Sequence, residues 1–260
     1  MKNDQNVLEK LHSRSFHGVI FDFDGTLLDV NEPLKQSIEE VFLENHINED
    51  METTISEIGS ILESIQGYPI PKILLQSHDI FKYMTVLKEL SFLKKLKIAM
   101  KIFTKFQTYS KEAKMFPGTK ELISLLSKNC SLFIVSHNKT KNVLEALERE
   151  GIDSYFNEVY GADLLPELKP NPEALMPPLK KSGNYKGREW LMIGDMPTDI
   201  EAGKEAGFYT IGIASGISKK EALAEFHPDL LVDSLSELLD LIKNGRVSDF
   251  NAKNSLKIKS

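Results

Sequence analysis

The sequence contains two tight clusters of aspartates, Asp-Phe-Asp-Gly-Thr at residues 22–26 and Gly-Asp-Met-Pro-Thr-Asp at residues 194–199. Four carboxylates with few histidines nearby make a hard, oxygen-rich site that suits Mg²⁺ and is poor for zinc. Such a metal neutralises the charge of a phosphate, so that an anionic carboxylate can approach phosphorus. The clusters therefore predict a magnesium-assisted reaction at phosphorus, with Asp22, Asp24, Asp195 and Asp199 as candidate metal ligands.

Two further clusters carry groups that bind phosphate, Ser136-His137-Asn138 and Lys169-Pro170. A hydroxyl, an ammonium group and the backbone N–H groups at a helix start can together hold a phosphate. We therefore predict that residues 136–138 and Lys169 form a phosphate cradle. We also predict that Gly25 and Thr26 bind the phosphate.

Asp22 and Asp24 form a candidate catalytic pair. The two-residue period of an extended chain places both side chains on the same side. Crowding of like charges favours retention of a proton by one of the two carboxyl groups. One aspartate can then act as nucleophile while the other acts as general acid.

A parallel sheet would bring these clusters together. Apolar, β-rich runs alternate with helical patterns after residue 116, as is typical of a parallel sheet covered on both faces. The predicted strands are 17–24, 131–135, a short one near Val159, 190–194 and 209–214, and the predicted helices are 119–128, 139–150, 172–182 and 198–206. Ligands bind at the carboxyl ends of such strands, where the clusters lie.

Between Glu32 and Lys114 the periodicity is helical alone, with apolar stripes spaced three and four residues apart. The stripes are Leu34, Ile38, Val41 and Phe42; Ile55, Ile58, Leu62 and Ile65; and Leu96, Met100, Phe103 and Phe106. We therefore predict an α/β protein with a Rossmann-like sheet and an all-helical cap inserted after the first strand. The predicted domains are a core of residues 1–30 and 115–242, a cap of residues 31–114 and a polar tail of residues 243–260.

Composition excludes several other classes of protein. The chain has 260 residues, one cysteine and a formal net charge of −6, which argues against a disulfide framework and against general affinity for nucleic acid. No apolar run approaches the roughly 18 to 20 residues that span a bilayer. The N-terminus lacks the apolar centre of a signal peptide. We expect a cytoplasmic protein that binds neither nucleic acid nor membrane.

The four clusters, in this order, resemble the four motifs of the haloacid dehalogenase superfamily. The resemblance covers about residues 18–239, and its most specific element is the Asp-x-Asp-Gly-Thr sequence directly after an apolar strand. The helical insertion and the ending at residues 227–234 resemble the phosphoglycolate phosphatase-like branch. An acid at position 24 is shared by the phosphatases and phosphomutases of the family, so cleavage of carbon–halogen or carbon–phosphorus bonds is disfavoured.

The resemblance implies a role for each residue. Asp22 would attack phosphorus and form an aspartyl-phosphate, and Asp24 would protonate the leaving group and then activate water. Lys169 would offset charge on the nucleophile, and Ser136 would hold a phosphoryl oxygen. Asp195 would bind Mg²⁺, together with Asp22 and the backbone carbonyl of Asp24. Asp199 would be either a second metal ligand or a partner that orients the metal ligands or Lys169.

The expected activity is hydrolysis of a small phosphorylated metabolite by a phosphoric monoester hydrolase. Phosphoglycolate is the first candidate substrate by resemblance, followed by sugar phosphates, nucleoside monophosphates and pyrophosphate. A phosphomutase and a non-catalytic phosphate-binding protein are the alternatives. The sequence leaves open the oligomeric state, the role of His137 and the role of the tail.

Two features of the predicted cap have no assigned role. Nine lysines stand against two acids between residues 82 and 114, which is typical of a solvated helix face but would also attract an anionic substrate. Residues 67–72 interrupt the helical pattern and are a candidate specificity loop.

Overall fold

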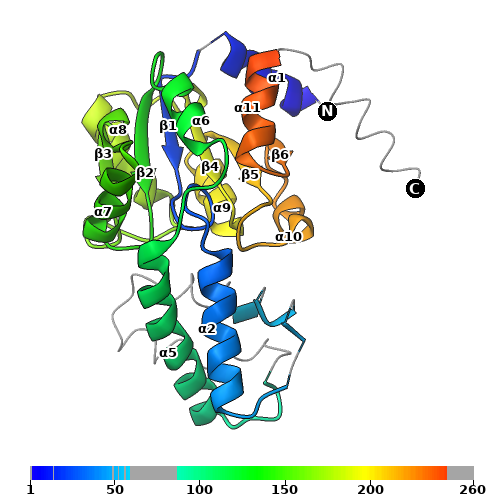
Figure 1. The fold of residues 1–260 in the computed structure, drawn as a ribbon. Coiled ribbons are helices and arrows are strands. Elements are labelled where there is room, and N and C mark those ends of the chain that lie inside the picture. Colours follow the sequence, from blue (N-terminus) through cyan, green and yellow to red (C-terminus); the bar gives the residue numbers. More distant parts are fainter. Residues whose placement is uncertain are drawn as a thin grey trace.

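The computed structural model describes residues 2–13, 15–48, 50, 51, 53–55, 57, 58 and 87–244. The described residues form a parallel six-stranded sheet in the order β3-β2-β1-β4-β5-β6 (Figure 1). The strands are β1 (Gly18–Phe21), β2 (Ser131–Val135), β3 (Glu158–Tyr160), β4 (Trp190–Gly194), β5 (Tyr209–Ile213) and β6 (Leu230–Val232). The α/β class and the first five strands are as predicted, whereas β6 is an addition.

Helices flank the sheet and extend below it. The α-helices are α1 (Lys2–His12), α2 (Asn31–Glu44), α5 (Phe92–Tyr109), α6 (Thr119–Leu126), α7 (Thr140–Glu150), α8 (Met176–Ser182), α9 (Pro197–Glu205), α10 (Lys220–Glu225) and α11 (Leu235–Asn244). The short 3₁₀ helices are η1 (Ser110–Glu112), η2 (Asp153–Tyr155), η3 (Pro172–Leu175) and η4 (Gly187–Glu189). None of the described helices combines the length and the apolar composition needed to cross a membrane.

Alternation along the strands creates two apolar cores, one on each face of the sheet. Val19 and Phe21 of β1 face a core that includes side chains of α6, α7 and α11. Ile20 of the same strand faces a second core with η3, α8 and α9. Both faces are therefore buried, and polar side chains collect at the carboxyl edge, as expected for a parallel sheet.

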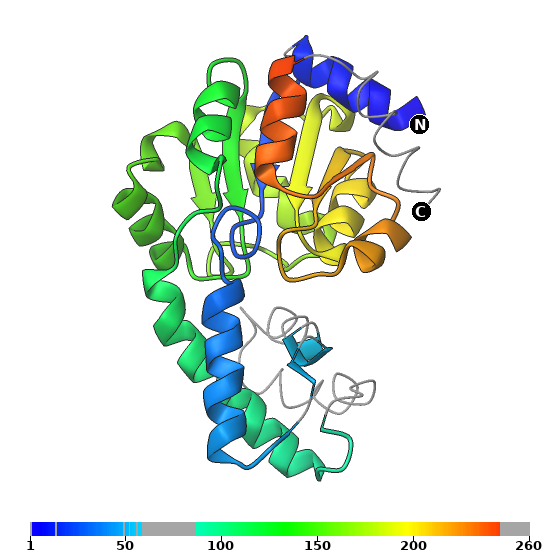
Figure 2. The same cartoon turned by 45° about the vertical axis from the view of Figure 1, so that its right-hand side comes forward.

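Helices α2 and α5, the described helices of the insertion between β1 and β2, project from that edge and pack side by side (Figures 1 and 2). The predicted stripe of α2 is buried, but the stripe predicted for α5 is wrong at Met100, whose exposed fraction is 53%. Helix α5 instead buries Ile98, Ala99, Ile102 and Phe106. Apolar residues occur on several sides of α5, so their spacing in the sequence is compatible with more than one buried face.

The two connections between the insertion and the sheet are hydrogen-bonded to one another. The Asp29 N–H donates to the Lys114 carbonyl at 2.8 Å, and the Phe116 N–H donates to the Leu27 carbonyl at 2.9 Å. Leu28 and Met115 form an antiparallel bridge between these bonds. The loop that follows β1 is thus tied to the chain segment that returns from α5.

Helix α1, which the sequence pattern did not predict, packs against α11 and β6. Val7, Leu8 and Leu11 are its buried residues. Helix α11 continues to Asn244, two residues into the predicted tail, and the rest of that tail lies outside the described residues.

Candidate active site

A buried lysine links two of the predicted aspartates at the carboxyl edge of the sheet. Asp22 directly follows β1, Asp199 lies in the first turn of α9, and Lys169 precedes η3. The Lys169 Nζ is 2.6 Å from the Asp22 Oδ1 and 2.6 Å from the Asp199 Oδ1. The three side chains are at most 5% exposed, so this ion-paired group is shielded from water.

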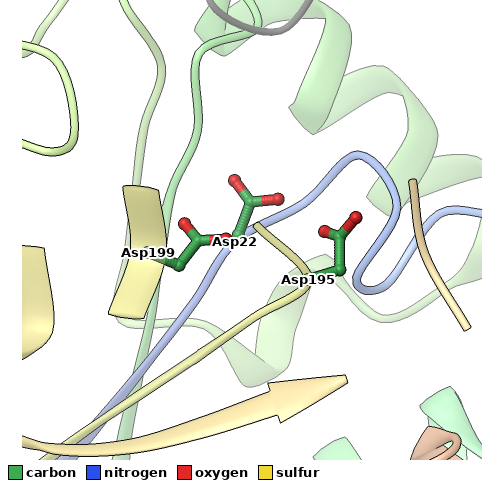
Figure 3. Close-up of side chains that lie close together, drawn as sticks. All are labelled: Asp22, Asp195 and Asp199. Carbon is green, nitrogen blue, oxygen red and sulfur yellow. The ribbon is translucent and has the colours of Figure 1, made fainter. Parts of the chain in front are cut away.

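Asp195, which follows β4, lies beside this group. Its Oδ1 accepts a hydrogen bond from the Thr26 hydroxyl at 2.7 Å, and its Oδ2 accepts one from the Ile217 N–H at 2.8 Å. One oxygen from each of Asp22, Asp195 and Asp199 falls within a 4.8 Å cluster, and Figure 3 shows the three carboxylates gathered together. These oxygens are the ligand type that Mg²⁺ prefers.

The cluster has more negative charge than its protein partners offset. Burial, and then the charges of Asp22 and Asp199, raise the pKa of Asp195 well above its usual range. Burial also raises the pKa of Asp199 to about 6, although Lys169 opposes that rise. Lys169 is the one buried lysine or arginine among the described residues. The chemistry of the donor set therefore fits a bound divalent cation.

Glycines let the loops approach the carboxylates closely. A Cβ atom at Gly25 would lie 2.3 Å from the Asp195 Oδ2, and one at Gly216 would lie 2.1 Å from the same atom. A Cβ at Gly194 would lie 2.1 Å from the Asp199 Oδ2. Only glycine fits at these positions without displacing a carboxylate.

Asp24, two residues after Asp22, has a different partner. Its Oδ2 accepts a hydrogen bond from the Asn138 side-chain Nδ2 at 2.9 Å. Asn138 follows β2 through Ser136 and His137, and its backbone N–H donates to the Ser136 Oγ at 3.0 Å. The loops after β1 and β2 are thus joined at the residue predicted to act as acid.

The structure brings together the residues predicted from the sequence, although some side chains point elsewhere than expected. Ser136 and His137 are buried, at 1% and 5% exposure. The Thr26 hydroxyl is directed at a carboxylate, and the Asn138 side chain is directed at Asp24. Phosphate binding by residues 136–138, Gly25 and Thr26 stays a prediction.

Sequence reasoning missed the loop after β5. Gly216 packs against Asp195 and Ile217 donates to it, while the Ser215 carbonyl accepts a hydrogen bond from the Asn31 side chain at 2.9 Å. This loop joins the acidic cluster to the first residue of α2. The same reasoning on strand ends could have found it, because Ala214-Ser215-Gly216 directly follows β5.

The lysine-rich segment of the insertion is partly neutralised by α2. Lys105 lies 2.7 Å from Glu40 and 3.2 Å from Glu44, and Lys101 lies 3.3 Å from Glu44. Hydrogen bonds from Lys105 and Tyr109 lower the pKa of Glu40. The candidate specificity loop at residues 67–72 lies outside the described residues.

Comparisons with known proteins agree with this geometry. The family model for haloacid dehalogenase-like hydrolases matches residues 19–213. A phosphoglycolate phosphatase of Vibrio parahaemolyticus is 32% identical over 231 residues, which are 86% of this chain and 95% of that protein. Pyrophosphatase PpaX of Oceanobacillus iheyensis is 26% identical over 88% of this chain and 98% of the PpaX chain. A solved structure, named as a predicted phosphoglycolate phosphatase from Haemophilus somnus, superposes with a TM-score of 0.63 at 25% identity, covering 87% of this chain and 98% of that one.

Proposed function

Because the chain belongs to the haloacid dehalogenase-like hydrolase family, we propose that this phosphatase hydrolyses a small phosphate monoester through an aspartyl-phosphate on Asp22. The observation that carries the proposal is the buried contact of Asp22 with Lys169. The ammonium group offsets the negative charge of Asp22 and of a phosphate that approaches it. Asp199 holds the other side of the same ammonium group and so fixes its position.

The reaction proceeds in two steps that use both aspartates of the first cluster. In the first, a carboxylate oxygen of Asp22 bonds to phosphorus while the bond between phosphorus and the leaving oxygen breaks. Asp24 gives its proton to that oxygen, and an alcohol leaves. In the second, Asp24 takes a proton from water, the water oxygen bonds to phosphorus and the Asp22–phosphorus bond breaks. The products are the alcohol and inorganic phosphate.

We propose that Asp22, Asp195 and Asp199 are the carboxylates available to a divalent cation, with Mg²⁺ as the expected ion. When bound, the metal supplies positive charge to the phosphate oxygens. The Thr26 hydroxyl and the Ile217 N–H orient the Asp195 carboxylate toward this role. The raised pKa of Asp195 supports the proposal, because burial and then the charges of Asp22 and Asp199 disfavour its ionised form, and a bound cation would offset these effects.

The proposed substrates are small phosphorylated metabolites. Phosphoglycolate comes first, because the relative at 32% identity is named for that activity, and pyrophosphate follows because a second relative is named a pyrophosphatase. We also propose that the helical insertion serves as a cap over the carboxyl edge of the sheet. Closure of such a cap excludes water and selects small substrates.

The test is phosphate release from a panel of small phosphate esters and pyrophosphate, with Mg²⁺ and with EDTA. Wild-type protein is expected to turn over at least one compound, only with the metal. Asp22→Asn is expected to lose roughly 10³-fold or more in kcat, since removal of a nucleophile abolishes the covalent route. Lys141→Ala, an exposed change in α7, is the matched control.

Activity of the Asp22→Asn variant at the wild-type level would overturn the covalent mechanism. A hexose 1-phosphate that is isomerised, without release of phosphate, would favour the phosphomutase alternative. Silence of the wild type on the whole panel would favour a non-catalytic binding protein.

A further inference from the structure

The side-chain amide of Asn138 has a fixed orientation. Its Oδ1 accepts hydrogen bonds from the Lys139 N–H at 2.8 Å and from the Asn142 Nδ2 at 2.8 Å. A flipped amide would present its own N–H groups to those two donors. The Nδ2 of Asn138 is therefore the end that faces Asp24, at 2.9 Å from the Asp24 Oδ2.

Asn142, which holds this orientation, lies at a helix end that is itself held in place by hydrogen bonds. It lies in the first turn of α7, where the Thr140 N–H donates to the Asp163 Oδ1 at 2.7 Å. The Thr140 Oγ1 accepts a hydrogen bond from the Gly161 N–H at 2.9 Å. These contacts join the start of α7 to the loop after β3, so the Asn142 side chain extends from a fixed helix end toward Asn138.

The donor at Asn138 fixes the rotation of the Asp24 carboxyl group. Its Nδ2 donates to the Asp24 Oδ2, so the plane of the carboxyl group follows the orientation of the Asn138 amide.

We propose that Asn142 and Asn138 form a positioning pair that orients Asp24 for proton transfer to the leaving group, an inference that rests on the proposed phosphatase activity. Asn142 fixes the amide of Asn138, and Asn138 fixes the carboxyl group of Asp24. Neither asparagine takes up a proton. In the first step the proton moves from the Asp24 carboxyl group to the leaving oxygen as its bond to phosphorus breaks. In the second step the same carboxyl group receives a proton from the attacking water.

This role differs from phosphate binding, which the sequence predicted for Asn138. A phosphate-binding residue acts on every substrate alike, because every substrate carries the same phosphoryl group. A residue that positions the general acid acts only where the leaving oxygen needs a proton. An alkyl alcohol needs that proton, whereas p-nitrophenolate leaves without it.

The experiment compares an alkyl phosphate from the active panel with p-nitrophenyl phosphate, each with Mg²⁺. Release of the alcohol or phenol is followed in single turnover with excess enzyme, because this isolates the first step. The variants are Asn142→Ala and Asn142→Asp, with Lys141→Ala as control. Asn142 is exposed, so truncation leaves the core packing intact, and an aspartate in the first turn of a helix is favourable.

Asn142→Ala is expected to slow release from the alkyl ester by about 10-fold or more, out of the roughly 10²- to 10⁴-fold that general acid catalysis contributes. Asn142→Asp is expected to slow it at least as much, because a carboxylate opposite the Asn138 Oδ1 removes the donor and disfavours the present orientation. Release of p-nitrophenol is expected to stay within about 2-fold of wild type, since it needs no proton.

Equal losses on both substrates, a change in KM alone, or no loss on either substrate would overturn the positioning role. Such results leave the proposed function intact, provided that the wild type is active and Asp22→Asn is not. An active Asp22→Asn variant, or a wild type inactive on both esters, overturns the proposed function and this inference with it.

Discussion

A lysine lies between two carboxylates at two places in the molecule. In the sheet domain Lys169 contacts Asp22 and Asp199, and the side chains are at most 5% exposed. In the helical insertion Lys105 contacts Glu40 and Glu44, and the side chains are 29% to 46% exposed. The lysine–carboxylate distances are similar, between 2.6 and 3.2 Å. The surroundings separate the two groups, because water screens one and is excluded from the other.

The comparison indicates that burial determines what the same ions can do. At the exposed group, water already stabilises each charge, so the ion pairs between α2 and α5 add little to stability. At the buried group each charge depends on the protein for its stabilisation, so the lysine there is the cation that offsets its carboxylate neighbours.

The largest expected difference comes from removing each lysine. Lys169→Met leaves Asp22 and Asp199 buried without their cation and is expected to lower the free energy of unfolding by about 3–5 kcal/mol. Lys105→Met changes only solvated side chains and is expected to leave the urea midpoint close to that of wild type. Urea unfolding monitored by circular dichroism tests both. Equal shifts in the two variants would show that burial does not distinguish the groups.

Magnesium is expected to bind to the buried group and not to the exposed one. At a Mg²⁺ concentration 100 times the dissociation constant, the wild type is expected to gain about 2.7 kcal/mol in free energy of unfolding. Asp195→Asn is expected to lose this gain, and Glu44→Gln is expected to keep it. Thermal unfolding with Mg²⁺ and with EDTA measures the difference. A gain retained in Asp195→Asn would place the metal elsewhere.

Glycines pack closely against the carboxylates of the buried site, and the addition of one methyl group tests this packing. Gly216→Ala would place its Cβ 2.1 Å from the Asp195 Oδ2 and is expected to cost about 1–3 kcal/mol and to weaken Mg²⁺ binding. Gly151→Ala meets open space, and its left-handed backbone alone is expected to cost about 1–2 kcal/mol. Calorimetric titration with Mg²⁺ separates the two, because only the first displaces a ligand. Unchanged Mg²⁺ affinity in Gly216→Ala would contradict this interpretation.

The smallest expected effect is that of salt. At 1 M ionic strength the screening length falls to about 3 Å, so the contribution of the Lys105 group is expected to vanish. The small difference in melting temperature between wild type and Lys105→Met should then close. The deficit of Lys169→Met should persist, because its neighbours are shielded from ions. A deficit that closes equally in both variants would mean that water reaches the buried group.

The sequence allowed prediction of the strands that carry the site, because apolar runs that end in Asp, Ser or Gly are a local signal. It did not indicate which oxygen faces which donor. The contact of Thr26 with Asp195 spans 169 residues, and that of Asn138 with Asp24 spans 114. Such pairs depend on how loops from different strands meet.

Helix α1 and strand β6 are two of the elements that the sequence pattern did not predict, and α10 and α11 are others. Helix α1 is short and amphipathic, and its burial depends on α11 at the other end of the chain. Strand β6 has three residues, too few for a periodic pattern to stand out. For α1, local periodicity carries no information about a partner so far along the chain.

The pairing of β1 has a consequence for protein synthesis. Gly18 pairs with Ser131 on one side and with Trp190 on the other, so the central strand is made well before either neighbour. At about 5–20 residues per second, a ribosome adds Ser131 roughly 6–23 s after Gly18. During that interval the apolar β1 has no sheet to join, whereas α2 can already form. Asp22 is thus translated early, but acquires its lysine and its acidic neighbours only when most of the chain has left the ribosome.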